Sequence, residues 1–490
     1  MENKKDKQIR VSQICFFMFA AILFFAKGIG WVDGEPAFKV CMALSLIFWI
    51  AKMLLTDHAV NEFLGMTLLL AVTAVSYRMS GEKGILVSAM VITGVKGIDL
   101  RRQFKIYTWI WAACCLTNIV LCFAGITIDL TSPRDKFGTR LLSCNLGFPN
   151  HSVFQMSYMA FAMMFVFAYY KQMNTKKYVY LFLGNVLCYM YSLATTGFLC
   201  CTAGLLFSYL FGLAEKKDCG MGLIKIQSRL VLPVCLLFSL AAPFVTDPKV
   251  FGIFDSILNG RLNYSRYFMT SGNFTPFGCR IYEVMSKEYF FLDSSYVSAL
   301  AQFGVITFII VFGIYEWAIW KMGERHMTVE LAITTAMIIS GIAEPFLFNM
   351  SFKNISLFFV GEIFFAEGGI IFAKNSNMLK GRHIMLLSSK DRDVSMKCKL
   401  QSAISGIASK EYENPISDRI VRFIVGCIAV VPFVISMSLG VRNFLTKFCS
   451  VLTFRGMGRL EGLRAFITWF LVGWAAVYFI QRILSSRKKG

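Results

Sequence analysis

The sequence is poor in the residues from which metal and redox sites are usually built. It has only 4 histidines among 490 residues, and its 15 cysteines form no Cys-x-x-Cys pair. The adjacent cysteines at 114–115 and 200–201 fall inside apolar runs, where a buried cysteine behaves as a small hydrophobic side chain. No spacing typical of a zinc or thiol–disulfide motif occurs. We therefore expect neither a metal nor another cofactor.

Charged residues are also scarce, at 16% of the chain, whereas hydrophobic residues make up 56%. Apolar runs of about 20 residues recur along the sequence, and each is long enough to cross a bilayer as a helix. In lipid only helices and closed barrels satisfy every backbone hydrogen bond, and these unbroken runs have helical length. The composition therefore excludes an ordinary soluble domain and predicts an all-α polytopic integral membrane protein.

The apolar runs predict a core of about 12 transmembrane helices within residues 1–373. The expected spans are 11–32, 38–56, 62–79, 84–98, 105–126, 152–170, 177–194, 196–213, 229–246, 296–320, 327–349 and 355–373. The segment 374–417 is polar and basic, which is typical of a cytoplasmic linker. Further runs at 418–440 and 463–483 predict a C-terminal helical hairpin with a basic tail, within residues 418–490.

The formal net charge of +21 indicates an orientation in the membrane. In a soluble protein this excess would suggest nucleic acid, but cytoplasmic loops of membrane proteins carry extra Lys and Arg. With the expected spans, the basic stretches all fall on one side. Both termini are then cytoplasmic, and the long loops 127–151 and 246–295 are outside. Acidic lipid headgroups, not nucleic acid, are the expected electrostatic partners.

The outer loop 246–295 contains Arg261, Arg266 and Arg280, against the charge bias of that side. Arginine is always charged and binds phosphate oxygens through two parallel hydrogen bonds, so arginines near the lipid surface suit a lipid pyrophosphate. Snorkelling to headgroups or surface ion pairs would also explain them. The acidic residues available for such pairs are Asp255, Glu283 and Glu288. From spacing alone, the surface explanation is slightly favoured.

The same loop is rich in aromatic side chains, whose flat faces pack on sugar rings. They are Tyr264, Tyr267, Phe268, Phe274, Phe277, Tyr282, Tyr289, Phe290 and Phe291. An aromatic belt at the membrane interface is the alternative, and it is favoured for Phe290 and Phe291.

Titratable candidates lie in the other outer loop and near the end of one span. His151 is the only histidine expected on the outer side, in a loop that also holds Arg134 and Arg140. Histidine suits a general base near neutral pH, but a hydrogen bond to a helix start explains it equally well. Glu344 falls near the outer end of the span 327–349. An ionisable residue inside a span is costly, and therefore points to a function.

Several short motifs occur in an order and a topological placement that resemble a known family. They are Val95-Lys-Gly-Ile-Asp-Leu-Arg-Arg102, Gly147-Phe-Pro-Asn150, Thr195-Thr-Gly-Phe198, Asn259-Gly-Arg261 with Phe277-Gly278, and Asp293-Ser-Ser-Tyr296 followed by Gly304. Glu344 and Asn354 also stand where the family tends to have Glu and Asn. Through residues 10–373 the chain resembles the Wzy-type O-antigen and capsular polysaccharide polymerases, within the O-antigen ligase–polymerase superfamily.

The chain departs from this family in three places. The family often has Ser-Arg-Thr-Gly where this sequence has Ala194-Thr-Thr-Gly197, so one arginine is missing. Asp-Asn is common in the family where Asp293-Ser294 stands here. The expected spans in 418–483 lie outside the usual architecture.

The resemblance implies a GT-C-like, metal-independent, inverting glycosyltransferase of the bacterial cytoplasmic membrane. Its substrates would be oligosaccharide repeat units on undecaprenyl pyrophosphate, joined on the outer face into an O-antigen, capsule or exopolysaccharide. A flippase and a chain-length regulator would be its partners.

The resemblance also implies roles for particular residues. Arg261 would hold the donor pyrophosphate, because stabilising charge on that leaving group is the main electrostatic demand of the reaction. The arginines that would assist it are Arg140, Arg266 and Arg280. A carboxylate or histidine would take the proton of the acceptor hydroxyl. The candidates, in order, are Asp293, Glu344 and His151.

Two other functions remain open at this point. A ligase that moves finished glycan onto another acceptor would share the same loops and arginine, so the sequence does not separate it from a polymerase. A flippase for lipid-linked oligosaccharide should have two repeated halves and charged residues that line a central cavity. The sequence shows neither feature.

Overall fold

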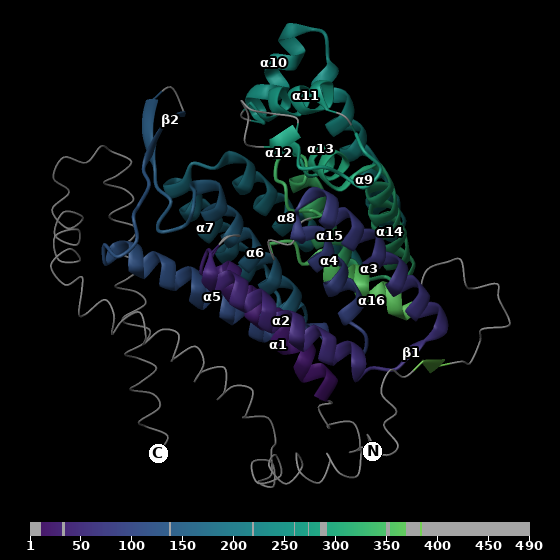
Figure 1. The fold of residues 1–490 in the computed structure, drawn as a ribbon. Coiled ribbons are helices and arrows are strands. Elements are labelled where there is room, and N and C mark those ends of the chain that lie inside the picture. The colour runs from purple at the N-terminus through teal and green to yellow at the C-terminus, as the bar shows by residue number, and fades with distance from the viewer. Residues whose placement is uncertain are drawn as a thin grey trace, which may run out of the picture.

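The structure is a computed structural model that describes residues 11–31, 35–136, 139–217, 220–258, 260–272, 274–284, 292–348, 353–368 and 383–384. Of the expected linker 374–417 it therefore describes residues 383–384 alone. The expected hairpin 418–490 lies outside the described residues. The described chain is mostly helical (Figure 1).

Eight helices of the described chain are long and apolar enough to cross a membrane. They are α1 (Val11–Gly28), α2 (Pro36–Leu54), α3 (Val60–Ser80), α5 (Leu100–Phe123), α6 with the 3-10 turn after it (His151–Gln172), α8 (Thr195–Lys217), α9 with the 3-10 turn after it (Met221–Phe244) and α14 (Val305–Glu324). The protein is therefore a multi-pass membrane protein, as its composition predicts.

Four more helices coincide with expected spans. Three of them are short: α4 (Lys83–Gly94), α15 (Thr328–Ser340) and α16 (Ser356–Ala366) have 12, 13 and 11 residues. The fourth, α7 (Thr175–Ser192), is 18 residues long and has lysines in its first turn. A straight crossing needs about 20 residues, so the predicted number of crossing helices, about 12, stays a prediction.

The short helices α15 and α16 are almost completely buried. α8 packs along α15, and α4 packs along α16. Aromatic rings fill the space where α1, α5 and α16 meet. Phe24, Phe104 and Phe358 contact one another there, at centroid distances of 5.1–6.2 Å. By contrast, α2, α7 and α9 expose Leu, Ile and Val side chains on their outer faces, which suits contact with lipid.

Polar residues placed just before apolar runs set where several helices begin. The side chain of Asp99 accepts a hydrogen bond from the backbone nitrogen of Arg102 at the start of α5. Asn150 and Asn174 do the same at the starts of α6 and α7. Such caps satisfy backbone N–H groups that have no partner within the helix.

Both expected outer loops lie at the same end of the helical body (Figure 1). Residues 127–151 contain an antiparallel hairpin of β2 (Ser132–Lys136) and β3 (Thr139–Ser143). The other loop is helical, with α10 (Pro248–Ile257), α11 (Arg261–Ser271) and α12 (Ile281–Val284). It leads into α13 (Ser295–Ser298) and a π-helical turn (Ala299–Phe303).

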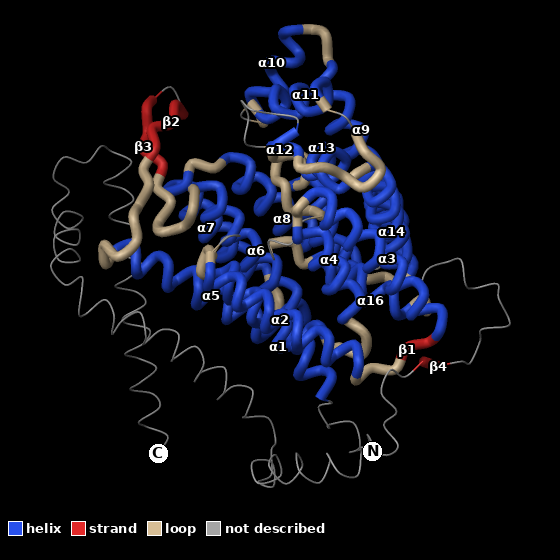
Figure 2. Tube along the Cα trace, viewed as in Figure 1, coloured by secondary structure: helices blue, strands red, loops and turns tan. Residues whose placement is uncertain are grey.

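A second strand pair lies at the opposite end (Figure 2). There β1 (His58–Ala59) pairs antiparallel with β4 (His383–Ile384), so part of the expected linker contacts the loop between α2 and α3. The expected all-α fold thus includes two short strand pairs. Neither belongs to the helical core.

The predicted orientation can be tested at Ser271, an exposed residue at the end of α11. After Cys144 and Cys279 are replaced by serine, a cysteine introduced by Ser271→Cys should react with a membrane-impermeant thiol reagent in intact cells. A cysteine introduced by Thr56→Cys, between α2 and β1, should react only after permeabilisation. The reverse pattern would show that the orientation is wrong.

Candidate functional site

Arg261 is the first residue of α11, and the chain before it fixes where that helix begins. Gly260 adopts a φ of +83°, a left-handed conformation that most side chains disfavour. The Asp255 carboxylate accepts hydrogen bonds from the backbone nitrogens of Leu262 and Asn263, at 3.0 and 3.4 Å. The turn and the carboxylate together hold the start of α11 against α10.

The guanidinium of Arg261 joins three parts of the chain. Its Nε donates to Asp293 Oδ2 at 2.8 Å, its Nη2 to Glu344 Oε1 at 3.2 Å and its Nη1 to Thr196 Oγ1 at 3.1 Å. The Arg261 side chain is only 11% exposed. Burial alone would lower the pKa of Arg261, but the carboxylates of Glu344 and Asp293 outweigh it and raise the pKa above its ordinary value.

Asp293 and Glu344 are brought together by hydrogen bonds between the segments that hold them. The backbone nitrogen of Ser295 donates to the Gly341 carbonyl at 2.8 Å, and its hydroxyl donates to the Glu344 carbonyl. The Ser295 hydroxyl also accepts from the Leu347 nitrogen at 3.0 Å. These bonds explain why Asp293-Ser-Ser-Tyr296 and Gly341-Ile-Ala-Glu-Pro345 act as one structural unit.

Gly278 and Gly304 allow two backbone segments to approach closely below this unit. A Cβ on Gly278 would lie 1.9 Å from the Gln302 carbonyl oxygen, and one on Gly304 would lie 2.1 Å from the Gly278 nitrogen. The Val305 nitrogen also donates to the Thr275 carbonyl at 3.0 Å. The Phe277-Gly278 motif thus fastens the loop 246–295 to the π-helical turn before α14.

Gly278→Ala should therefore lower the free energy of unfolding by about 2–3 kcal/mol, because the backbone must shift to admit the methyl group. Gly220→Ala is the matched control. Gly220 also has a positive φ, of +78°, but a Cβ there would meet nothing within 4 Å. Its cost should be about 1–2 kcal/mol, from backbone conformation alone. If Gly278→Ala and Gly220→Ala lowered the midpoint of thermal unfolding equally, the close approach of Gly278 to the Gln302 backbone would be contradicted.

The hairpin of the first outer loop places Arg134 and His151 beside the same cluster. Arg134 in β2 donates from Nη2 to His151 Nε2 at the start of α6. Burial lowers the pKa of Arg134, and the nearby charge of Arg261 lowers it further. Because a guanidinium only donates, Nε2 of His151 must be the acceptor in this contact.

Three arginines that the sequence singled out do not meet Arg261. Arg140 is exposed on β3. Arg266 donates to the carbonyls of Pro243 and Val245, which ties α11 to the end of α9. Arg280 is 54% exposed and pairs with Glu283 at 3.4 Å, the surface ion pair that the sequence allowed.

Three residues in or beside the cluster had no assigned role in the sequence analysis. Thr196 lies in the Ala194-Thr-Thr-Gly197 motif, and Arg134 lies in the first outer loop. Lys353 also acts electrostatically on Glu344. The sequence offered only the motif and the loop as signals, and neither specifies a contact with Arg261.

Asn354, which the resemblance also marked, has a structural role. Its side-chain nitrogen donates to the Tyr315 hydroxyl at 3.0 Å and to the Leu347 carbonyl at 2.8 Å. Its oxygen accepts from the backbone nitrogen of Ser356 at 3.0 Å. These bonds hold the start of α16 below the loop that contains Glu344.

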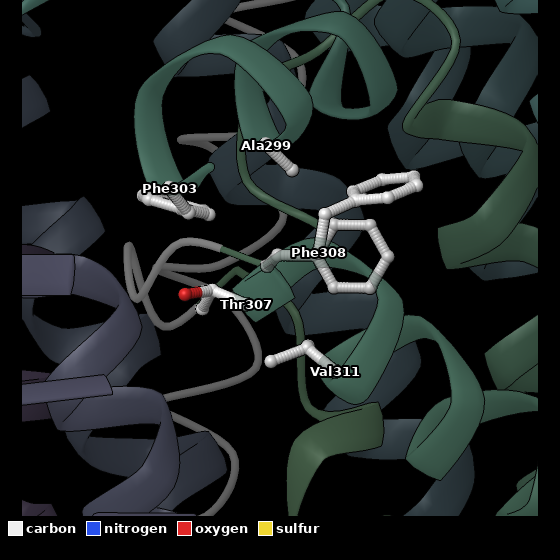
Figure 3. Close-up of a pocket in the computed structure, with 6 residues that line it drawn as sticks. Ala299, Phe303, Thr307, Phe308 and Val311 are labelled. Atoms are coloured by element: carbon white, nitrogen blue, oxygen red, sulfur yellow. The ribbon is translucent and has the colours of Figure 1, made fainter. Parts of the chain in front are cut away.

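Among the described residues, no group of three His, Cys, Asp or Glu side chains is placed to hold a metal ion. A pocket between the π-helical turn and α14 is apolar apart from Thr307 (Figure 3). Its lining is Ala299, Phe303, Thr307, Phe308, Val311 and Phe348. It offers no charged group to a phosphate, so the polar cluster around Arg261 is the better candidate for anion chemistry.

The cluster therefore combines partly or fully buried cationic and anionic side chains from both expected outer loops and from the segment after α15, at one end of a multi-pass membrane protein. Such a site can bind a phosphate and also supply a proton acceptor. Comparisons of the chain with protein-family models, curated proteins and solved structures found no match.

Proposed function

We propose that the protein polymerises oligosaccharide repeat units linked to undecaprenyl pyrophosphate, on the outer face of the bacterial cytoplasmic membrane. The observation that supports this most is the buried contact of Arg261 with Asp293 and Glu344. Each of these residues was expected at the site, and they come from segments far apart in the sequence. The proposal includes a GT-C-like core, cytoplasmic termini, and a flippase and chain-length regulator as partners.

In this proposal Arg261 and Arg134 bind the donor pyrophosphate. A guanidinium forms two parallel hydrogen bonds with phosphate oxygens, and its charge stabilises the negative charge that develops as the pyrophosphate leaves. Arg134 replaces Arg140 as the second arginine because its guanidinium lies beside His151 and within electrostatic reach of Arg261.

Asp293 is the best placed proton acceptor. Its side chain is 29% exposed, whereas that of Glu344 is 10% exposed and lies deeper. Nε2 of His151 already accepts from Arg134, so it can take a substrate proton only if that contact breaks. Glu344 then serves chiefly to hold the Arg261 guanidinium in position.

Purified protein in lipid nanodiscs, supplied with a lipid-linked repeat unit alone, tests the proposal. A polymerase should yield a ladder of products that differ by one repeat unit and should release undecaprenyl pyrophosphate. A ligase would need a second, chemically different acceptor before any glycan is transferred. A transporter would release no undecaprenyl pyrophosphate under either condition, and that outcome would contradict the proposal.

A further inference from the structure

The hydrogen-bonding edges of Arg261 are already in use within the protein. A guanidinium can hold a phosphate through two donors along its Nε–Nη2 edge or its Nη1–Nη2 edge. Nε and Nη2 donate to Asp293 and Glu344, and Nη1 donates to Thr196. Nε has a single N–H, and Asp293 occupies it. A phosphate that binds through the Nε–Nη2 edge therefore has to displace Asp293.

The three acceptors differ in how easily they can be displaced. Thr196 is 7% exposed and lies in α8, one of the long helices. The side chain of Glu344 is 10% exposed, and Ser295 binds both the Glu344 carbonyl and the Leu347 nitrogen. Asp293, with 29% of its side chain exposed, is the most accessible of the three. A ligand that enters from solvent therefore reaches the contact between Asp293 and Arg261 before it reaches the other two contacts.

The charges around Arg261 favour such an exchange. The two carboxylates of Asp293 and Glu344 face three cationic side chains, because Lys353 acts electrostatically on Glu344 and Arg134 lies near Arg261. In the described chain, the hydrogen-bonding partner of Arg134 is the neutral acceptor atom Nε2 of His151, not a carboxylate. An anion between Arg134 and Arg261 would reduce the repulsion between their two positive charges. A pyrophosphate provides this charge and also has enough oxygens for both side chains.

We infer that the donor pyrophosphate takes the place of Asp293 on Arg261, and that the displaced carboxylate becomes the proton acceptor for the incoming sugar hydroxyl. The inference rests on the proposed function and adds an order of events. The donor must bind first, because its binding frees the base. Before the donor binds, Asp293 pairs with Arg261. After the donor has bound, Asp293 is the proton acceptor.

The chemical step balances with the groups present. The acceptor hydroxyl oxygen forms a bond to the anomeric carbon of the donor, and the bond from that carbon to the pyrophosphate oxygen breaks. The electron pair of the broken bond leaves on the lipid pyrophosphate, where Arg261 and Arg134 stabilise it. The hydroxyl proton passes to Asp293, which has lost its cationic partner and is therefore a better proton acceptor.

The test is a binding measurement on the full-length protein in phosphatidylcholine nanodiscs, with geranylgeranyl pyrophosphate as the probe. Asp293→Asn keeps a hydrogen-bond acceptor near Nε but removes the competing charge, so it should bind the probe about five- to tenfold more tightly. The same variant should form no polymer from lipid-linked repeat units. Asp247→Asn, an equal charge change at an exposed helix cap on α10, should alter neither property.

Arg261→Ala separates this inference from the proposed function. One outcome is that Arg261→Ala abolishes probe binding while Asp293→Asn binds the probe as the unaltered protein does. In that case pyrophosphate binds at Arg261 but does not displace Asp293, and the inference is wrong. Weaker binding by Asp293→Asn would likewise overturn the exchange, because Asp293 would then only orient Arg261. If Arg261→Ala binds the probe normally, the pyrophosphate site itself is wrong.

Discussion

Arg261→Lys is expected to make almost no polymer, although the protein remains folded and the charge is kept. A lysine ammonium is a point charge and cannot reproduce the planar fork that a phosphate requires. The loss of this contact should cost about 3 kcal/mol of transition-state stabilisation, or about a hundredfold in rate. Arg261→Ala should be at least as slow. The measurement is the initial rate of undecaprenyl pyrophosphate release in nanodiscs.

The matched controls are Arg280→Lys and Arg280→Ala. Arg280 lies in the same outer loop, but it is exposed and pairs with Glu283 at the surface. An exposed pair of this kind contributes about 0–1 kcal/mol, so both variants should keep near-normal rates. Normal product from Arg261→Lys would show that the reaction does not need the two parallel hydrogen bonds of a guanidinium at this position. Loss of product from both Arg280 variants would place Arg280 at the site instead.

Glu344→Leu is expected to lower both the stability and the rate, and a second substitution should separate the two effects. Glu344→Leu leaves the buried Arg261 with the more exposed Asp293 as its carboxylate partner in the described chain, at a cost of about 2–3 kcal/mol in the free energy of unfolding. In the double variant Arg261→Met with Glu344→Leu, apolar side chains of similar size replace both partners. Its midpoint of thermal unfolding should exceed that of Glu344→Leu, and it should still make no polymer.

The double variant thus tests whether the pair is needed for chemistry apart from its effect on folding. A double-mutant cycle measures the coupling between two residues, which is expected here because Arg261 and Glu344 are in contact. A double variant less stable than either single variant would contradict the coupling. Recovery of polymer formation by the double variant would exclude Arg261 from the site.

The sequence indicated which charged residues to consider, but it could not show which of them meet. Arg261 stood out because an arginine in an expected outer loop goes against the charge bias of that side, and Glu344 because charge is costly in a span. The resemblance added Asp293. Their contact depends on Ser295, whose hydrogen bonds join two segments, and no periodicity in the sequence predicts such a tertiary contact.

The assignment of Arg140 shows why some site residues could not be predicted. In the β2–β3 hairpin, Arg134 is opposite Leu141, whereas Arg140 is opposite Asp135. Residues directly opposite each other in an antiparallel pair share a face, and adjacent pairs face opposite ways. The two arginines therefore lie on opposite faces. A change of register by one residue would place both arginines on the same face, and the sequence does not fix that register.

The segment around Arg266 was expected to be a loop. For this reason the sequence analysis did not separate Arg261 from Arg266 by the directions of their side chains. Arg261 and Arg266 are both in α11. Residues five apart in an α-helix are rotated by about 140° around its axis, so their side chains cannot point at one ligand. Had the helix been expected, the sequence alone would have separated these two arginines.

The shortness of α15 determines how deep the cluster lies in the membrane. Glu330 in the first turn of α15 pairs with Arg101 in the first turn of α5 at 2.9 Å, so the two helices begin at the same level. At 1.5 Å per residue, the 13 residues of α15 extend about 20 Å and the 24 residues of α5 about 36 Å. Glu344 follows α15 after only a short loop.

Measured from that level, α15 can raise the chain by at most about 20 Å along the membrane normal before the short loop to Glu344, which is less than a hydrocarbon layer about 30 Å thick. A pyrophosphate at the level of ordinary headgroups would then not reach the Arg261 cluster. Either the bilayer thins beside α15 or the lipid carrier sinks, and local thinning costs only a fraction of a kcal/mol per ångström. The thickness of the surrounding membrane thus becomes a variable of the reaction, and the rate should fall in bilayers built from longer acyl chains.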